Sequence, residues 1–125
     1  MKKEQEIRVL MVEPNEHPKE FLLKNTLSAM QEAVGGMIDI ADLEGDICLL
    51  LNDEGKLIGL DGCRRIGDDI IAGTFYVCGS NEEGELVSLS DDEMERYREM
   101  FWEPEEITQD EVQEANKIDI MFFDF

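Results

Sequence analysis

The stretch from Met37 to Leu89 alternates short apolar runs with tight turns, and this spacing constrains the fold more than any other feature. The runs with strand-like composition are Met37–Ala41, Asp46–Asn52, Lys56–Leu60, Ile70–Cys78 and Glu85–Leu89. Parallel strands need crossover connections of a dozen or more residues, whereas turns such as Asn52–Gly55 join antiparallel neighbours. The spacing therefore predicts a mostly antiparallel sheet.

Two more strands and two main helices are predicted outside this stretch. The additional strands are Ile7–Val12 and Lys19–Lys24. One helix is expected to follow a cap at Asn25-Thr26 and to end at the Gly35-Gly36 pair. The second helix begins at the capping box Ser90–Glu93. The expected fold class is α+β, with a curved, mostly antiparallel sheet and the two main helices packed on one face.

The C-terminal part of the chain differs in composition from the rest. We expect residues 1–103 to form a single α+β domain and residues 104–125 to form an acidic C-terminal extension. Thr108–Glu111 predicts the start of a short acidic helix that runs to about Asn116. The apolar run Ile118–Phe125 predicts a terminal strand after that helix.

The apolar side chains at the end of the chain are candidate interaction residues. They are Met121, Phe122, Phe123 and Phe125. Exposed together, such side chains would promote aggregation. We expect them to pack, either within one chain or across a homodimer.

The charge of the chain excludes several classes of partner. The sequence has 31 acidic and 11 strongly basic residues, for a net charge of −20. Such a charge repels nucleic acid and anionic membranes, because phosphate contacts supply most nucleic-acid affinity. We therefore expect no direct nucleic-acid binding, no membrane association and a protein partner. The absence of a signal peptide or apolar span predicts a cytoplasmic location.

No catalytic, metal or cofactor motif is recognisable. The three cysteines lie far apart in the sequence, which predicts free thiols rather than a zinc site. The only histidine, His17, lies in a polar loop. Acidic clusters at Asp39–Asp46 and Asp53-Glu54 do not have the spacing of a calcium loop. We expect a non-catalytic protein with no metal and no cofactor.

Arg64 and Arg65 are the candidate ligand-binding residues. They are adjacent, basic and flanked by Gly62 and Gly67 in a chain with few bases. Guanidinium groups bind phosphates and carboxylates in a bidentate manner, so the pair could hold an anion. The alternative is that one arginine fastens the loop to nearby aspartates, here Asp61, Asp68 and Asp69.

Four stretches of the chain resemble an uncharacterised bacterial family. They are VGGMIDI, LNDEGKLIGL, CRRIGDDIIAGTFYVCG and LVSLSDDEMERYREMF. The family is known only as a domain of unknown function, and its members often occur on conjugative elements and phages of gut bacteria. The resemblance covers about residues 7–102 and is most specific at Arg64–Gly67 and Asp69–Phe75. It implies an accessory protein of a mobile element, without a reaction or catalytic residues.

Three functional hypotheses follow, and one of them is a purely structural protein that self-associates through residues 118–125. The other two involve a partner or a ligand. The first is an accessory protein that acts by protein binding, in one form as an acidic mimic of DNA that occupies a DNA-binding protein. The second is a protein or enzyme that binds a nucleotide or other anionic metabolite through Arg64 and Arg65.

Overall fold

The structure is a computed structural model that describes residues 5–123, and the side chains of residues 5–117. The main sheet has the strand order β2-β1-β7-β4-β3, with β8 paired to β7, and every pairing is antiparallel. Its strands are β1 Glu6–Val12, β2 Lys19–Lys24, β3 Ile38–Glu44, β4 Ile47–Asn52, β7 Phe75–Ser80 and β8 Leu86–Val87. The prediction of an α+β fold with a mostly antiparallel sheet is confirmed.

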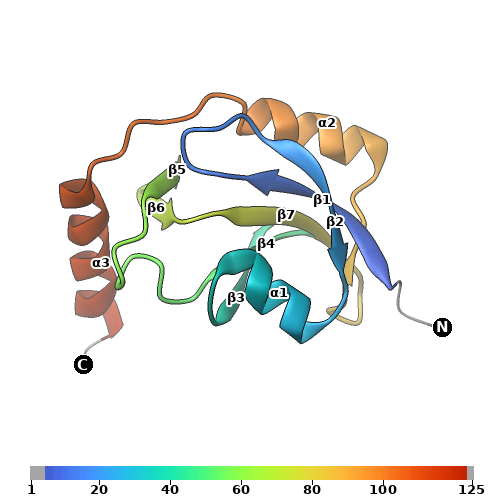
Figure 1. Cartoon of the computed structure of the whole chain (residues 1–125), viewed down its shortest axis with the longest axis horizontal. Helices are drawn as coiled ribbons and strands as arrows, with labels where there is room; N and C mark the ends of the chain where they lie inside the picture. Colours follow the sequence, from blue (N-terminus) through green and yellow to red (C-terminus); the bar gives the residue numbers. More distant parts are fainter. Residues whose placement is uncertain (1–4, 124–125) are drawn as a thin grey trace.

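The remaining strands form a separate hairpin. Strands β5, Gly62–Ile66, and β6, Asp69–Ala72, pair only with each other among the described residues. Helices α1, α2 and α3 span Leu27–Val34, Asp91–Met100 and Gln109–Phe123. The hairpin lies near one end of the main sheet, and α3 lies beside it (Figure 1).

The two main helices pack on opposite faces of the main sheet, so the prediction that they share one face is wrong. Met94 and Tyr97 of α2 pack with Leu10, Leu49 and Val77. On the other face, α1 packs against the side chains that alternate with these in β1, β4 and β7; they include Val9, Cys48, Leu50, Tyr76 and Cys78. Because these central strands are apolar at successive positions, both faces of the sheet must be covered.

Both predicted ends of the first main helix and the predicted start of the second are confirmed. The Thr26 hydroxyl accepts a hydrogen bond from the Ala29 amide at 3.1 Å, and Gly35 ends α1 with a left-handed φ of 76°. At α2, the Ser90 hydroxyl and the Glu93 carboxylate each accept a hydrogen bond from the other residue's amide. These local contacts satisfy amides that the first helical turn leaves without partners.

Two predictions of strands between Asn52 and Cys78 need correction. Lys56–Leu60 is not a strand but part of a series of turns, in which the Ile58 amide donates to the Glu54 carbonyl. Ile70–Cys78 is not one strand, because Gly73 breaks it into β6 and β7 with a φ of 88°. A side chain at Gly73 would also meet Leu60, so the chain turns where only glycine fits easily.

The prediction of a terminal strand is also wrong over its described part. Residues 118–123 continue α3, which is longer than the expected short helix. The run is apolar at nearly every position, and such a run does not distinguish a short strand from a helical segment. Residues 124 and 125 lie outside the described residues, as do the side chains of Met121, Phe122 and Phe123.

The three cysteines are free and buried. Burial raises the pKa of the Cys48 thiol to about 11 and that of Cys63 to about 12, and it raises the pKa of Cys78 further. Since the thiolate is the reactive form, we expect all three to resist a disulfide reagent at pH 8 and to react after denaturation in guanidinium chloride. Absorbance of the released thiolate measures this. A thiol that reacts at the rate of free cysteine in the native protein would contradict the prediction.

The structure contains no described helix with both the length and the apolar character needed to cross a membrane.

Candidate functional site

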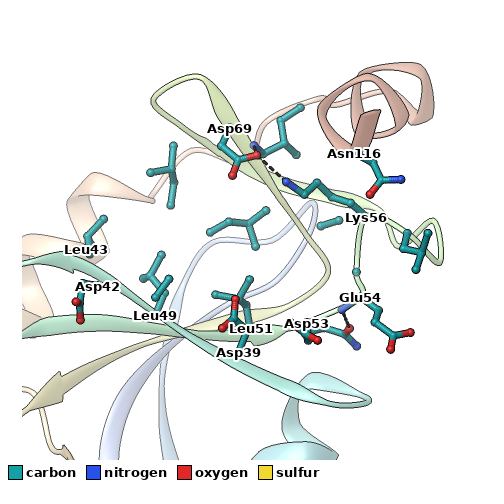
Figure 2. Close-up of a pocket in the computed structure, with 18 residues that line it drawn as sticks. Asp39, Asp42, Leu43, Leu49, Leu51, Asp53, Glu54, Lys56, Asp69 and Asn116 are labelled. Carbon is teal, nitrogen blue, oxygen red and sulfur yellow. Dashed lines mark hydrogen bonds and ion pairs between the residues drawn. The ribbon is translucent and has the colours of Figure 1, made fainter. Parts of the chain in front are cut away.

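The candidate site is a cavity of about 550 Å³ between the main sheet and the β5–β6 hairpin. One wall comes from β3 and β4, on the face of the sheet that also carries α2. The opposite wall comes from β6 and the end of β5, and α3 contributes Asn116 at the margin. Figure 2 shows the hairpin and α3 above the two strands, with side chains of both walls directed into the space between them.

The inner surface of the cavity is apolar. It is lined by Leu43, Leu49, Leu51, Ile66, Ile70 and Ile71, among others. Leu49 and Ile71 belong to the buried core on this side of the sheet, and Leu51 and Ile66 pack against it. The apolar surface is therefore continuous with the buried core.

The rim of the cavity is acidic. Asp39, Asp42, Asp53, Glu54 and Asp69 line it and are exposed. Lys56 is the one basic residue among the described residues that line the cavity, and its ammonium is 2.7 Å from the Asp69 carboxylate. Four of the five carboxylates thus add negative charge that this lysine does not neutralise. The arrangement suits a ligand with a positive charge and an apolar part.

The turn after β4 is held in place by a buried side chain. Asn52 is 5% exposed; its amide group donates to the Val34 carbonyl at 3.1 Å, and its carbonyl oxygen accepts from the Glu54 amide at 2.8 Å. Gly55 then passes so close to β6 that a side chain there would lie 2.5 Å from the Ala72 carbonyl oxygen. These contacts position Asp53 and Glu54 at the rim.

Arg64 does not line the cavity but is buried, with 1% of its surface exposed. Its guanidinium donates to the carbonyl oxygens of Phe101 at 3.0 Å, Cys63 at 2.8 Å and Glu16 at 2.7 Å, with a longer contact to Glu13. The side chain therefore joins the hairpin to the β1–β2 loop and to the end of α2.

Arg65 points the other way, and 43% of its side chain is exposed. Its guanidinium lies 3.1 Å from the Glu105 carboxylate and 2.8 Å from that of Glu111. The fastening role considered for one arginine is present in both, but with partners other than Asp61, Asp68 and Asp69. Anion binding by either residue remains a prediction, which thermal shift against nucleotides would test with Arg65→Ala as the control variant.

A second hollow beside α2 is more open and its charges are more nearly balanced. It is lined by five acidic residues together with Arg8 and Arg98. Arg8 lies 2.7 Å from Glu20 and 2.6 Å from Asp91, and its hydrogen bond lowers the pKa of the Glu20 carboxyl. At one end, Trp102 stacks on His17 with ring centres 4.1 Å apart. Two of its five carboxylates, those of Glu20 and Asp91, already have a basic partner, and we favour the first cavity as the site because its acidic rim surrounds an apolar interior.

Sequence reasoning identified the acidic clusters but not the cavity they border. The spacing of Asp39, Asp42, Asp53 and Glu54 does not match a calcium loop, and the described residues contain no group suited to a metal. The sequence does carry one signal for the cavity. One acidic cluster lies before β4, partly on its neighbour β3, and the other lies directly after β4. Their meeting with Asp69 depends on the hairpin folding over the sheet.

The comparisons with known proteins identify one relationship. The model of a family described as "Domain of unknown function (DUF3846)" matches residues 7–102. No curated protein and no solved structure matches the chain. The matched residues include the main sheet, the hairpin, α1 and α2, whereas Glu105, Glu111 and the whole of α3 lie beyond them.

Proposed function

The chain belongs to the DUF3846 family, a family of unknown function, and on that premise we propose that it is a non-catalytic accessory protein that binds a cationic segment of another protein at the cavity. The observation that carries the proposal is the pairing of an acidic rim with an apolar interior in one hollow of about 550 Å³. The mobile-element setting implied by the family resemblance belongs to the same proposal. Enrichment of genes for this family within conjugative elements and phages would test that part.

The cavity fits a lysine or arginine side chain in both of its parts. Such a side chain has an aliphatic stem, which would lie against Leu49 and Ile71, and a charged head, which would reach the rim carboxylates. The net charge of −20 would steer a cationic partner toward the protein. High salt would screen the charges and weaken this attraction. Charge alone is not specific, so the apolar interior is needed to select the segment.

Neutralising the rim is expected to weaken binding of a cationic probe. The probe is a peptide of seven alternating lysine and valine residues with blocked ends, measured by isothermal titration calorimetry. We expect the double variant Asp39→Asn, Asp53→Asn to bind it about tenfold more weakly, because two carboxylates that would pair with the lysine ammonium groups are lost from the rim. The matched control is Glu82→Gln, Glu83→Gln, which makes the same charge change in the exposed turn between β7 and β8.

Equal weakening by the two double variants would mean that only net charge attracts the peptide, and it would overturn the proposal. A second peptide, with serine in place of valine, tests the apolar interior. It should bind more weakly than the valine peptide to the wild-type protein.

The DNA-mimic form of the hypothesis names one class of cationic partner. A mimic occupies the DNA-binding surface of its partner, so duplex DNA and this protein would exclude each other. The measurement is competition on any partner recovered by affinity purification. Simultaneous binding of DNA and this protein would reject the mimic while leaving the cationic-segment proposal in place.

A further inference from the structure

Strand β3 is an edge of the main sheet. It pairs with β4 and is the last strand in the order β2-β1-β7-β4-β3. An edge strand presents amides and carbonyls that another chain can pair with. The same strand forms one wall of the cavity through Asp39, Ala41 and Leu43. Edge and cavity are therefore adjoining parts of one surface.

The register shows which backbone groups of β3 point outward. The Asp53 amide donates to the Met37 carbonyl at 2.9 Å, so these opposed residues form a hydrogen-bonded pair. Bonded and non-bonded pairs alternate along an antiparallel ladder. Ile38 and Ile40, opposite Asn52 and Leu50, therefore turn their amides and carbonyls away from β4. The bulge between Asp42 and Glu44 limits the straight part of this edge to its first half.

The charges on the edge select the kind of strand that could pair there. Asp39 and Asp42 are exposed and have no ion-pair partner within 4 Å among the described residues, whereas Glu44 is engaged by Arg96 and Tyr97. A second copy would bring the same aspartates against these, and like charges opposite each other are destabilising. A basic strand would be attracted instead.

We propose that β3 accepts an extended, lysine- or arginine-bearing segment of the partner protein as an additional strand of the main sheet. The inference rests on the proposed function and names its binding mode. Asp39 and Ala41 face the cavity, while Ile40, which is 47% exposed, faces the side of α1. The accepted segment thus carries basic residues on the cavity side and apolar residues on the Ile40 side, in alternation.

The sheet offers a second edge for comparison. Strand β2 carries Lys19, Glu20 and Lys24, so its charge is mixed. The Asn25 amide donates to the Gln5 carbonyl, and the same alternation turns the backbone of Leu22 outward. Leu22 is 62% exposed. Ile40 and Leu22 are therefore equivalent positions on two edges that differ in charge.

Proline at these positions tests the edge directly. Ile40→Pro removes an outward amide without removing a β3–β4 hydrogen bond, and Leu22→Pro does the same at the other edge. For the lysine–valine peptide we expect Ile40→Pro to weaken binding about tenfold, and Leu22→Pro to leave it within a factor of two. Thermal melts check that both variants fold. If Ile40→Pro is unfolded, the wild-type protein is titrated with a peptide N-methylated on the edge facing β3, which should bind about tenfold more weakly.

The outcomes separate this inference from the proposed function. If backbone changes in the protein and the peptide leave affinity unchanged while Asp39→Asn, Asp53→Asn weakens it, strand addition is wrong and cavity binding stands. If the cavity variant and both backbone changes have no specific effect, both proposals fall. A dimer in sedimentation that Ile40→Pro abolishes would also overturn the inference, because a second copy would then occupy the edge.

Discussion

Replacing Arg64 by methionine is expected to lower the free energy of unfolding by about 3 kcal/mol, since several backbone carbonyls lose a charged donor inside the protein. The guanidinium is buried and joins the Glu16 carbonyl in the β1–β2 loop to the Phe101 carbonyl at the end of α2. Methionine retains most of the side-chain volume but donates no hydrogen bond. Urea unfolding followed by far-UV circular dichroism measures the change.

The adjacent residue is the control for this prediction. Arg65→Met removes an equal charge, but its ion pairs with Glu105 and Glu111 are exposed, and pairs of this kind contribute about 1 kcal/mol or less. A loss below about 1 kcal/mol for Arg64→Met would show that burying its charge costs as much as its hydrogen bonds return.

The different roles of Arg64 and Arg65 illustrate what could be predicted from the sequence. Because Gly62 and Gly67 flank both arginines, the sequence favours a loop at these positions. They lie instead on strand β5, where neighbouring side chains point to opposite sides. Recognition of the strand would have predicted one inward and one outward arginine. The partners of the two arginines could not have been predicted, since Phe101, bound by Arg64, and Glu105, bound by Arg65, are each about 40 residues away in the sequence.

Features encoded within a few residues were predicted well. The caps at Thr26 and Ser90 and the end of α1 at Gly35 depend on local hydrogen bonds and glycine conformation. Predicting which face of the sheet each helix covers requires more than these local signals. The central strands are apolar at successive positions, as in Ile47–Leu50, and this pattern signals burial on both faces. It could have placed α1 and α2 on opposite sides.

The candidate site illustrates the limit of local reasoning. Its walls come from β3, β4, the turn after β4, β6 and α3, which are separate in sequence. The turn could be mistaken for a strand because Lys56–Leu60 contains two leucines and an isoleucine. Leu57 and Ile58 are in fact exposed, so apolar residues here do not mark a buried strand.

Replacing Phe75 by alanine is expected to lower the free energy of unfolding by about 3–5 kcal/mol, because a fully buried aromatic ring is lost from a packed core. Phe75 begins β7 and is completely buried, and its ring meets Phe101 edge-on at 5.3 Å. The control is Phe21→Ala on the edge strand β2, where the ring is only partly buried against Tyr76. Chemical denaturation should show a clearly smaller loss for the control, and equal losses would contradict this account of the core.

Phe75 and Arg64 are expected to be coupled, because both act on Phe101. The Phe75 ring packs against the Phe101 ring, and the Arg64 guanidinium donates to the Phe101 carbonyl oxygen. Once Phe75→Ala has freed the end of α2, removing the guanidinium should cost less than it does in the intact protein. The double variant should therefore be more stable than the sum of the single losses predicts, by about 0.5 kcal/mol or more. Strict additivity would mean that the end of α2 is held by each contact independently, so that the hairpin and the helix are not joined through one residue.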